Sequence, residues 1–203
     1  FIIGKNFIGN NTVCLILGDN IFYGHGLQGL MQKSAKIEEG ALIFSYEVSD
    51  PERYGIVEVN EQRQVLSIEE KPDHPKSNLA VPGIYFYDNQ VVDIAHNLVP
   101  SSRGELEITD LNRVYLEKEQ LRAEVLGRGV AWLDAGTHES LLQASTFIQA
   151  IQERQGLMVS SPDEIAYRKG FISRYEFSIL VKGFSGNGYG KYLQHILDSE
   201  IYG

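Results

Sequence analysis

The sequence has 203 residues, enough for one large domain or for one domain with a substantial appendage. Its 43% hydrophobic and 22% charged residues are typical of globular proteins, and no apolar run approaches the roughly 20 residues that a membrane span needs. The net charge of -9 repels polyanions and so argues against a nucleic-acid groove, whereas a small anionic substrate would need a local cation or a metal ion.

Strands and helices alternate along the first part of the chain. The apolar run at 12–17 predicts a strand covered on both faces, as in an α/β sheet. Its single cysteine, Cys14, is expected to be a buried thiol of a reduced, cytoplasmic protein. Apolar residues at 27–34 recur at helical spacing, and Thr109 is the predicted N-cap of a second helix. Further strands are predicted at 41–48, 55–59, 64–70, 81–87, 123–126 and 130–133.

Beyond Asp134 only helices are predicted. Thr137 precedes a long helical pattern, Ser161-Pro162 opens a short helix, and two more patterns follow at 175–181 and 189–197. We therefore predict an α/β domain over residues 1–136, with a mostly parallel mixed sheet, and a helical segment over residues 137–203.

A literal G-x-G-x-x-G occurs at Gly24, Gly26 and Gly29, but its position does not suit a dinucleotide-binding turn. That turn follows its strand directly, whereas here residues 18–23 intervene. The acidic residue expected about 20 positions further on falls at a helix end. We therefore expect a plain glycine-rich loop, and a Rossmann oxidoreductase is a distant alternative.

Two aspartates each follow a short apolar strand. Asp19 comes after the strand at 12–17, and Asp134 comes after the one at 130–133 and before a turn of small residues. Open α/β sheets bind ligands at the carboxyl ends of their strands. A carboxylate there can hold Mg²⁺, which binds through one or two carboxylates plus substrate phosphates, or it can simply cap a turn. The two aspartates could converge on one metal ion.

Three charged residues are the other candidates. By the two-residue period of a strand, Glu70 continues an apolar face, so it is a candidate acceptor for substrate hydroxyls; a solvated strand end is the simpler alternative. Lys71 follows directly, and Pro72 must end the strand. Arg103, in a polar loop, could clamp a phosphate through two hydrogen bonds or be an ordinary surface arginine.

Taken together and in this order, six segments resemble the glucose-1-phosphate thymidylyltransferase family. The resemblance extends from Phe1 to the C-terminus, and the set is far more specific than any one segment. The segments are LGDNIFYG at 17–24, YGIVE at 54–58, IEEKP at 68–72, VPGIYFY at 81–87, GELEITDLN at 104–112 and WLDAGT at 132–137.

The resemblance implies a Rossmann-like, GT-A-like nucleotidyltransferase fold and a reaction for bacterial deoxysugar synthesis. In that reaction dTTP and glucose 1-phosphate give dTDP-glucose and pyrophosphate, and phosphoryl-type transfer of this kind needs no protein nucleophile. The resemblance also implies a homotetramer and Mg²⁺ as cofactor. By motif position, Asp19 and Asp134 would bind the metal and Lys71 and Arg103 the sugar phosphate. The glucose site would be lined by Tyr54, Gly55, Glu70 and Val81.

One part of the family pattern has no counterpart in this sequence. The family begins with a strand and a glycine-rich loop, G-G-x-G-T-R-L, that wraps the nucleotide triphosphate, whereas this chain starts at Phe1 within a helix-like pattern. We therefore expect a piece of a longer protein that supplies the loop. The alternatives are a sister nucleotidyltransferase that uses UTP, ATP or CTP, and an inactive fragment that acts only by assembling with other chains.

Overall fold

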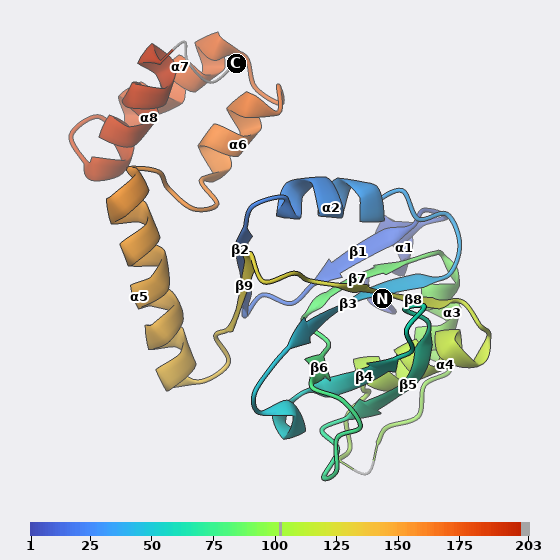
Figure 1. Ribbon diagram of the computed structural model, residues 1–203. Helices are drawn as coiled ribbons and strands as arrows, with labels where there is room; N and C mark the ends of the chain where they lie inside the picture. The colour runs from blue at the N-terminus through green and yellow to red at the C-terminus, as the bar shows by residue number, and fades with distance from the viewer. Residues whose placement is uncertain (102, 200–203) are drawn as a thin grey trace. The chain divides into compact units, whose positions relative to one another are not determined.

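Figure 1 shows the computed structural model, which describes residues 1–101 and 103–199. The chain divides into two compact units, Phe1–Thr137 and His138–Gly203. Ser102 of the polar loop and residues 200–203 of the predicted helical segment lie outside the described residues. The first unit contains, in chain order, α1 Lys5–Ile8, β1 Val13–Ile16, β2 Asn20–Gly24, α2 Leu27–Ser34, β3 Ala41–Glu47, a short 3-10 helix Pro51–Arg53, β4 Gly55–Val59, β5 Val65–Glu70, β6 Leu79–Ala80, β7 Ile84–Tyr87, α3 Gln90–His96, α4 Ile108–Glu117, β8 Leu121–Val125 and β9 Val130–Asp134.

Two sheets form the first unit. The larger has the strand order β1-β7-β3-β6-β4-β5, with β8 paired to β3. The smaller pairs β2 with β9. All pairings are antiparallel among the described strands except that of β3 with β8. The α/β class is confirmed, but the prediction of a mostly parallel sheet is wrong, because β7 runs antiparallel between β1 and β3 and because β4 and β5 form a hairpin.

The middle of the larger sheet is covered on both faces. Successive residues of a strand point to opposite faces, so Ala41 and Ile43 of β3 join one core cluster, whereas Leu42 and Phe44 join another. Side chains of α3 and α4 pack in the first cluster, and side chains of α2 pack against the second. Helices therefore hold this sheet from both sides.

Strand β1 is covered less fully than the sequence predicts. Val13 and Leu15 pack against the main core, whereas Cys14 is exposed and the side chain of Ile16 is 58% exposed. The predictions of a strand covered on both faces and of a buried thiol are therefore wrong. The reason is that successive side chains point to opposite faces, and only the face of Val13 and Leu15 packs against the core.

The second unit contains α5 His138–Gln155, α6 Pro162–Arg168, α7 Arg174–Gly183 and α8 Gly188–Asp198. Its core forms around Phe177 and Leu193, which are fully buried on α7 and α8. The side chain of Ser161 caps α6, where the sequence predicts a helix start, because it accepts a hydrogen bond from the orphan N–H of Glu164. Within residues 1–101 and 103–199, no helix combines the length and the apolar character that crossing a membrane requires.

Asp88 is a buried carboxylate that ties the core of the first unit together. It is 5% exposed and accepts hydrogen bonds from the N–H of Gly40 at 2.7 Å, from the N–H of Gln90 at 3.0 Å and from the phenol of Tyr115 at 2.8 Å. Burial alone would raise the pKa of Asp88, but these donors together with the Gln90 amide lower it below its usual value.

We therefore expect Asp88 to make the free energy of unfolding fall in acid. A carboxyl whose folded pKa is depressed stabilises the fold above its unfolded pKa, near 4, and loses this contribution as the pH falls through the folded pKa. Asp88→Asn should lower the free energy of unfolding by about 1–3 kcal/mol at neutral pH and flatten its acid dependence. Denaturant titrations across this pH range measure both effects. Asp93→Asn, on the exposed side of α3, is the control, and equal behaviour of the two variants would contradict the assignment.

Candidate active site

A cleft of about 220 Å³ lies in the first unit where the small sheet meets the ends of β4, β5 and β7. It is lined by the predicted site residues Asp19, Tyr54, Gly55, Glu70, Lys71, Val81 and Asp134. Arg103 is not among the lining residues, but its guanidinium lies 3.8 Å from the carboxylate of Glu70. The seven lining residues named come from five separate segments of the chain, which thus meet at one place.

The pairing of β2 with β9 brings the two aspartates together. Asn20 pairs with Asp134, and the carbonyl of Asp19 accepts the N–H of Ala135 at 2.7 Å. A Cβ on Gly136 would lie 3.1 Å from Oδ1 of Asp134 and 3.5 Å from Oδ2 of Asp19. Carboxylate oxygens of Asp19, just before β2, and of Asp134, at the end of β9, therefore face the space that this glycine leaves open.

Two carboxylates that face one space could hold a magnesium ion. Among the described residues, no group of three or more His, Cys, Asp or Glu could hold a metal ion. Two hard carboxylates fit Mg²⁺, which keeps several water ligands and takes the others from substrate phosphates. A closed structural zinc site would need four protein ligands.

Asn20 connects the two sheets beneath these carboxylates. Its Oδ1 accepts hydrogen bonds from the indole Nε1 of Trp132 at 2.7 Å and from the N–H of Gly83 at 3.0 Å. These two donors fix the amide orientation, so Nδ2 donates to Oδ1 of Asp19 at 2.8 Å. Sequence reasoning missed Asn20, although it lies directly beside Asp19 and its partner Trp132 lies two residues before Asp134.

Glu70 ends β5 and turns its carboxylate into the cleft. Its Oε2 accepts a hydrogen bond from Oγ1 of Thr109 at 2.5 Å. A Cβ on Gly55, which pairs with Glu70 across β4 and β5, would lie 3.1 Å from this hydroxyl and 3.2 Å from Oε2. The prediction that Thr109 caps α4 is wrong, because Glu107 is the N-cap residue and Thr109, within the helix, is free to bond Glu70.

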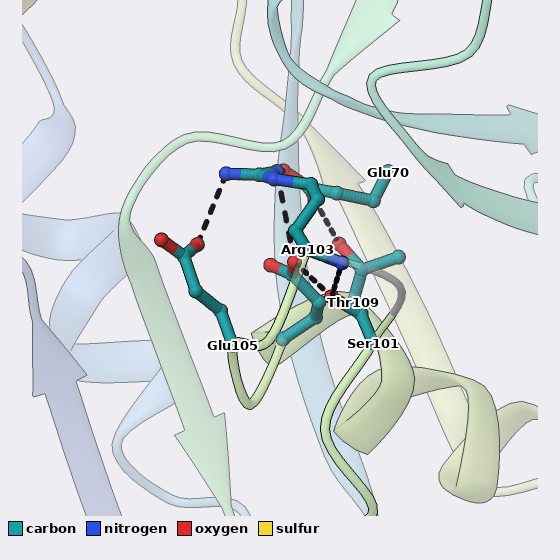
Figure 2. Close-up of polar contacts among 6 residues, drawn as sticks. Glu70, Ser101, Arg103, Glu105 and Thr109 are labelled. Atoms are coloured by element: carbon teal, nitrogen blue, oxygen red, sulfur yellow. Dashed lines mark hydrogen bonds and ion pairs between the residues drawn. The ribbon is translucent and has the colours of Figure 1, made fainter.

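Arg103 is surrounded by carboxylates, as Figure 2 shows. Its guanidinium lies 3.0 Å from Glu105, 3.6 Å from Glu107 and 3.8 Å from Glu70. The loop is braced by Ser101, whose hydroxyl donates to Glu107 at 2.9 Å and accepts the N–H of Arg103 at 3.2 Å. Arg103 is thus held beside the cleft, where an incoming phosphate would compete with three carboxylates.

Lys71 lies at a bend in the backbone just after β5. Its φ of 41° is in the left-handed region, and its N–H donates to the carbonyl of Tyr54 at 3.0 Å. Its ammonium forms no ion pair with any residue in the described part of the chain. Lys71 therefore offers an exposed positive charge beside Glu70.

Val81 is held on the other side of β4, where its N–H donates to the carbonyl of Gly55 at 2.8 Å.

Aromatic and amide side chains complete the walls of the cleft. The ring of Tyr54 lies 5.1 Å from that of Trp132. Burial, and then the nearby charges of Glu70 and Asp19, raises the pKa of Tyr85 well above its usual value, so this phenol stays protonated. Sequence reasoning gave no role to Trp132, to Tyr85 or to Asn112, whose buried Nδ2 has no hydrogen-bond partner among the described residues.

In the glycine motif, Gly24 and Gly26 have structural roles. Gly24 lies in β2, where a Cβ would approach the carbonyl oxygen of Gly129 to 2.6 Å. Gly26, with φ of 81°, is the N-cap residue of α2. The expected glycine-rich loop is therefore a strand followed by a helix start. Gly24 is required by the close approach of β9.

The α/β fold and the paired carboxylates at strand ends define a nucleotidyltransferase-like class. The sequence profile described as nucleotidyl transferase matches residues 1–151, and the chain belongs to this family. Within the family it is homologous to glucose-1-phosphate thymidylyltransferases. It is 52% identical to that of Neisseria meningitidis serogroup A over 97% of this chain and 68% of the relative, and 52% identical to that of Mycolicibacterium smegmatis over 98% of this chain and 69% of the relative.

A solved structure shows the same likeness. It is the crystal structure of a protein described as a glucose-1-phosphate thymidylyltransferase from Bacillus anthracis, in complex with sucrose. The two chains are 41% identical with a TM-score of 0.62, and the match covers 71% of this chain and 57% of the other. This chain thus spans about two thirds of the Neisseria relative and somewhat more than half of the crystallised protein.

Proposed function

We propose that the protein containing this chain transfers a thymidylyl group from dTTP to glucose 1-phosphate. A phosphate oxygen of glucose 1-phosphate attacks the α-phosphorus of dTTP. The bond between this phosphorus and the oxygen that bridges it to the β-phosphorus breaks, so that dTDP-glucose forms and pyrophosphate leaves. The observation that carries the proposal is the convergence of seven motif residues in one cleft, in a chain 52% identical to a relative of that name.

The proposed roles follow from the charges and contacts of the cleft. Glu70, oriented by Thr109, accepts hydrogen bonds from sugar hydroxyls beside Tyr54, Gly55 and Val81. Lys71 and Arg103 hold the sugar phosphate. The attacking nucleophile is the substrate's own phosphate, so the side chains align the two anions and offset their charge.

Asp19 and Asp134 would hold Mg²⁺, which offsets negative charge on the reacting phosphates when bound. Asn20 would keep Asp19 oriented through its hydrogen bond. Assembly into four copies, a cytoplasmic location and a place in deoxysugar synthesis belong to the same proposal and are supported by the resemblance of the sequence motifs.

A pyrophosphate-release assay tests the proposal. The natural protein that contains this chain, checked first by its intact mass, is supplied with Mg²⁺, glucose 1-phosphate and dTTP, UTP, ATP or CTP in turn. Release with dTTP at the highest kcat/KM is the expected result. A clear preference for another nucleotide would replace the thymidylyl proposal by a sister reaction, and no release with any nucleotide would reject transferase activity.

Lys71→Ala should raise the KM for glucose 1-phosphate by about tenfold or more and change kcat less, because a charge-assisted hydrogen bond to the phosphate is lost. Steady-state kinetics with glucose 1-phosphate as the varied substrate measure the two constants separately. The control is Lys76→Ala, whose ammonium is paired with Glu69 at 2.7 Å and does not line the cleft. An unchanged KM in Lys71→Ala would remove this residue from the phosphate site.

A further inference from the structure

Outside the cleft, the first unit has a second hollow of about 380 Å³, which we term the basic groove. Its cationic side chains come from three separate elements: Lys33 and Lys36 at the end of α2, Arg63 in the turn between β4 and β5, and Arg122 on β8. It shares no lining residue with the cleft. The groove is therefore a separate feature that the proposed transferase reaction does not use.

Positive charge in the groove exceeds the negative charge that lines it. Glu124 is the one carboxylate among the lining residues of the groove, and it lies 3.4 Å from the ammonium of Lys33. Arg122 donates to the backbone carbonyl of Glu39 at 2.9 Å, which leaves its charge uncompensated. In the described part of the chain, Lys36, Arg63 and Arg122 have no carboxylate within ion-pair distance.

Three further carboxylates line an adjoining hollow. Glu38, Glu39 and Glu119 line that hollow together with Lys36 and Arg122. Oε1 of Glu39 accepts a hydrogen bond from the Gln120 amide at 3.2 Å, and none of the three carboxylates forms an ion pair with a cation of the groove among the described residues. A cationic groove in a chain of net charge -9 concentrates anions locally although the whole molecule repels them.

The turn that carries Arg63 is held in place. Oδ1 of Asn60 accepts the N–H groups of Gln62 at 3.0 Å and Gln64 at 2.9 Å, and the N–H of Arg63 donates to the carbonyl of Asn60 at 2.9 Å. Gln64 forms an isolated β-bridge with Arg122. The two arginines are thus anchored on backbones that are hydrogen-bonded to each other, which lowers the entropic cost of using both on one ligand.

We propose that the basic groove binds a small anion that carries a diphosphate group. Arginine forks suit phosphate oxygens, and two arginines with two lysines against one glutamate match an anion of several negative charges. The volume lies in the range of small-ligand sites, and Ile37, Leu42 and Ala123 give it an apolar wall. A single hollow, in place of an extended basic stripe, favours a small anion over a nucleic acid.

Titration calorimetry on the full chain with inorganic pyrophosphate and, separately, with ADP tests this site. A chelator is present, so that Asp19 and Asp134 cannot recruit phosphates through a metal ion. Arg63→Gln/Arg122→Gln should weaken binding by at least about tenfold, because charge-assisted hydrogen bonds are lost. Arg154→Gln/Lys182→Gln removes two exposed cations of the second unit and is the matched control. Lys71→Ala/Arg103→Ala removes the proposed phosphate-binding charges of the cleft, and the effect of Arg63→Gln/Arg122→Gln should persist in that background.

The outcomes separate the ligand sources and the competing explanations. Groove-dependent binding that is tighter for ADP assigns the site to organic diphosphates, and equal or tighter binding of pyrophosphate assigns it to the inorganic anion. Absence of binding of both anions, or binding in the Lys71→Ala/Arg103→Ala background that Arg63→Gln/Arg122→Gln leaves unchanged, overturns the proposal. If the cations served only to stabilise the end of α2, the variant would shift the thermal midpoint and leave anion binding unchanged, which also overturns it. None of these results bears on the transferase proposal, which is tested by pyrophosphate release and concerns the cleft and not the basic groove.

Discussion

Asp19→Asn and Asp134→Asn are each expected to lower Mg²⁺-dependent turnover by at least about 100-fold. Each substitution removes a charged ligand of the metal ion, and that ion is what offsets the negative charge of the reacting phosphates. Asparagine keeps the shape of the side chain and one oxygen but loses the charge. Asp134 ends β9, Asp19 directly precedes β2, and both carboxylates face the space beside Gly136, so each loss should weaken binding of the same ion. Pyrophosphate release at several Mg²⁺ concentrations measures the effect.

A second readout keeps the metal assignment independent of turnover. Binding of Mn²⁺ as a magnetic substitute for Mg²⁺, followed by electron paramagnetic resonance without substrate, should weaken in both variants. Asp93→Asn, on α3 and not in the cleft, is the control and should bind the ion as the unchanged protein does. Turnover and ion binding within a few-fold of the unchanged protein in both variants would remove the two aspartates from the metal site.

Local signals in the sequence predict several elements well. Ser161-Pro162 marks the start of α6 because the hydroxyl and the fixed φ of proline act within one turn of the chain. The strand at 55–59 matches β4, and Pro72 follows the end of β5 as expected. Such signals need only neighbours in the chain, so no knowledge of the fold is required to interpret them.

Features set by distant partners escape this kind of prediction. The sequence predicts no strand at 20–24 because the partner β9 lies far along the chain, and only that partner explains why position 24 must be a glycine. The prediction of a mostly parallel sheet is wrong for the same reason, since the apolar run at 12–17 does not reveal that β7 pairs antiparallel beside it. No helix is predicted at 90–96 from the sequence, although side chains of α3 are part of the main core.

The candidate site shows the same division. Asp19 and Asp134 could be proposed from strand ends alone, because strand ends collect ligands in open α/β sheets. Thr109 lies only two positions beyond the true N-cap, yet that small shift changes it from a backbone cap into the partner of Glu70. The bonds of Asn20 to Trp132 and Gly83 join three segments and require the folded structure.

Those bonds make Asn20→Ala the variant expected to affect both the fold and the chemistry. Truncation removes the acceptor of Trp132 and Gly83, and two donors left without a partner should lower the free energy of unfolding by about 2–4 kcal/mol. It also frees Asp19 to rotate, since the bond at 2.8 Å to Oδ1 is lost. We expect turnover to fall by about 10–100-fold and the Mg²⁺ requirement to rise.

Comparing Asn20→Ala with Asn20→Asp separates the two effects. Aspartate still accepts from Trp132 and Gly83, so most of the stability should return. It cannot donate to Asp19 when ionised, and two adjacent carboxylates repel each other, so turnover should stay low at neutral pH. Asn97→Ala, which loses only an exposed bond to the carbonyl of Asp93, is the control for stability. Full turnover in Asn20→Asp would show that Asn20 serves the fold alone and that Asp19 needs no positioning partner.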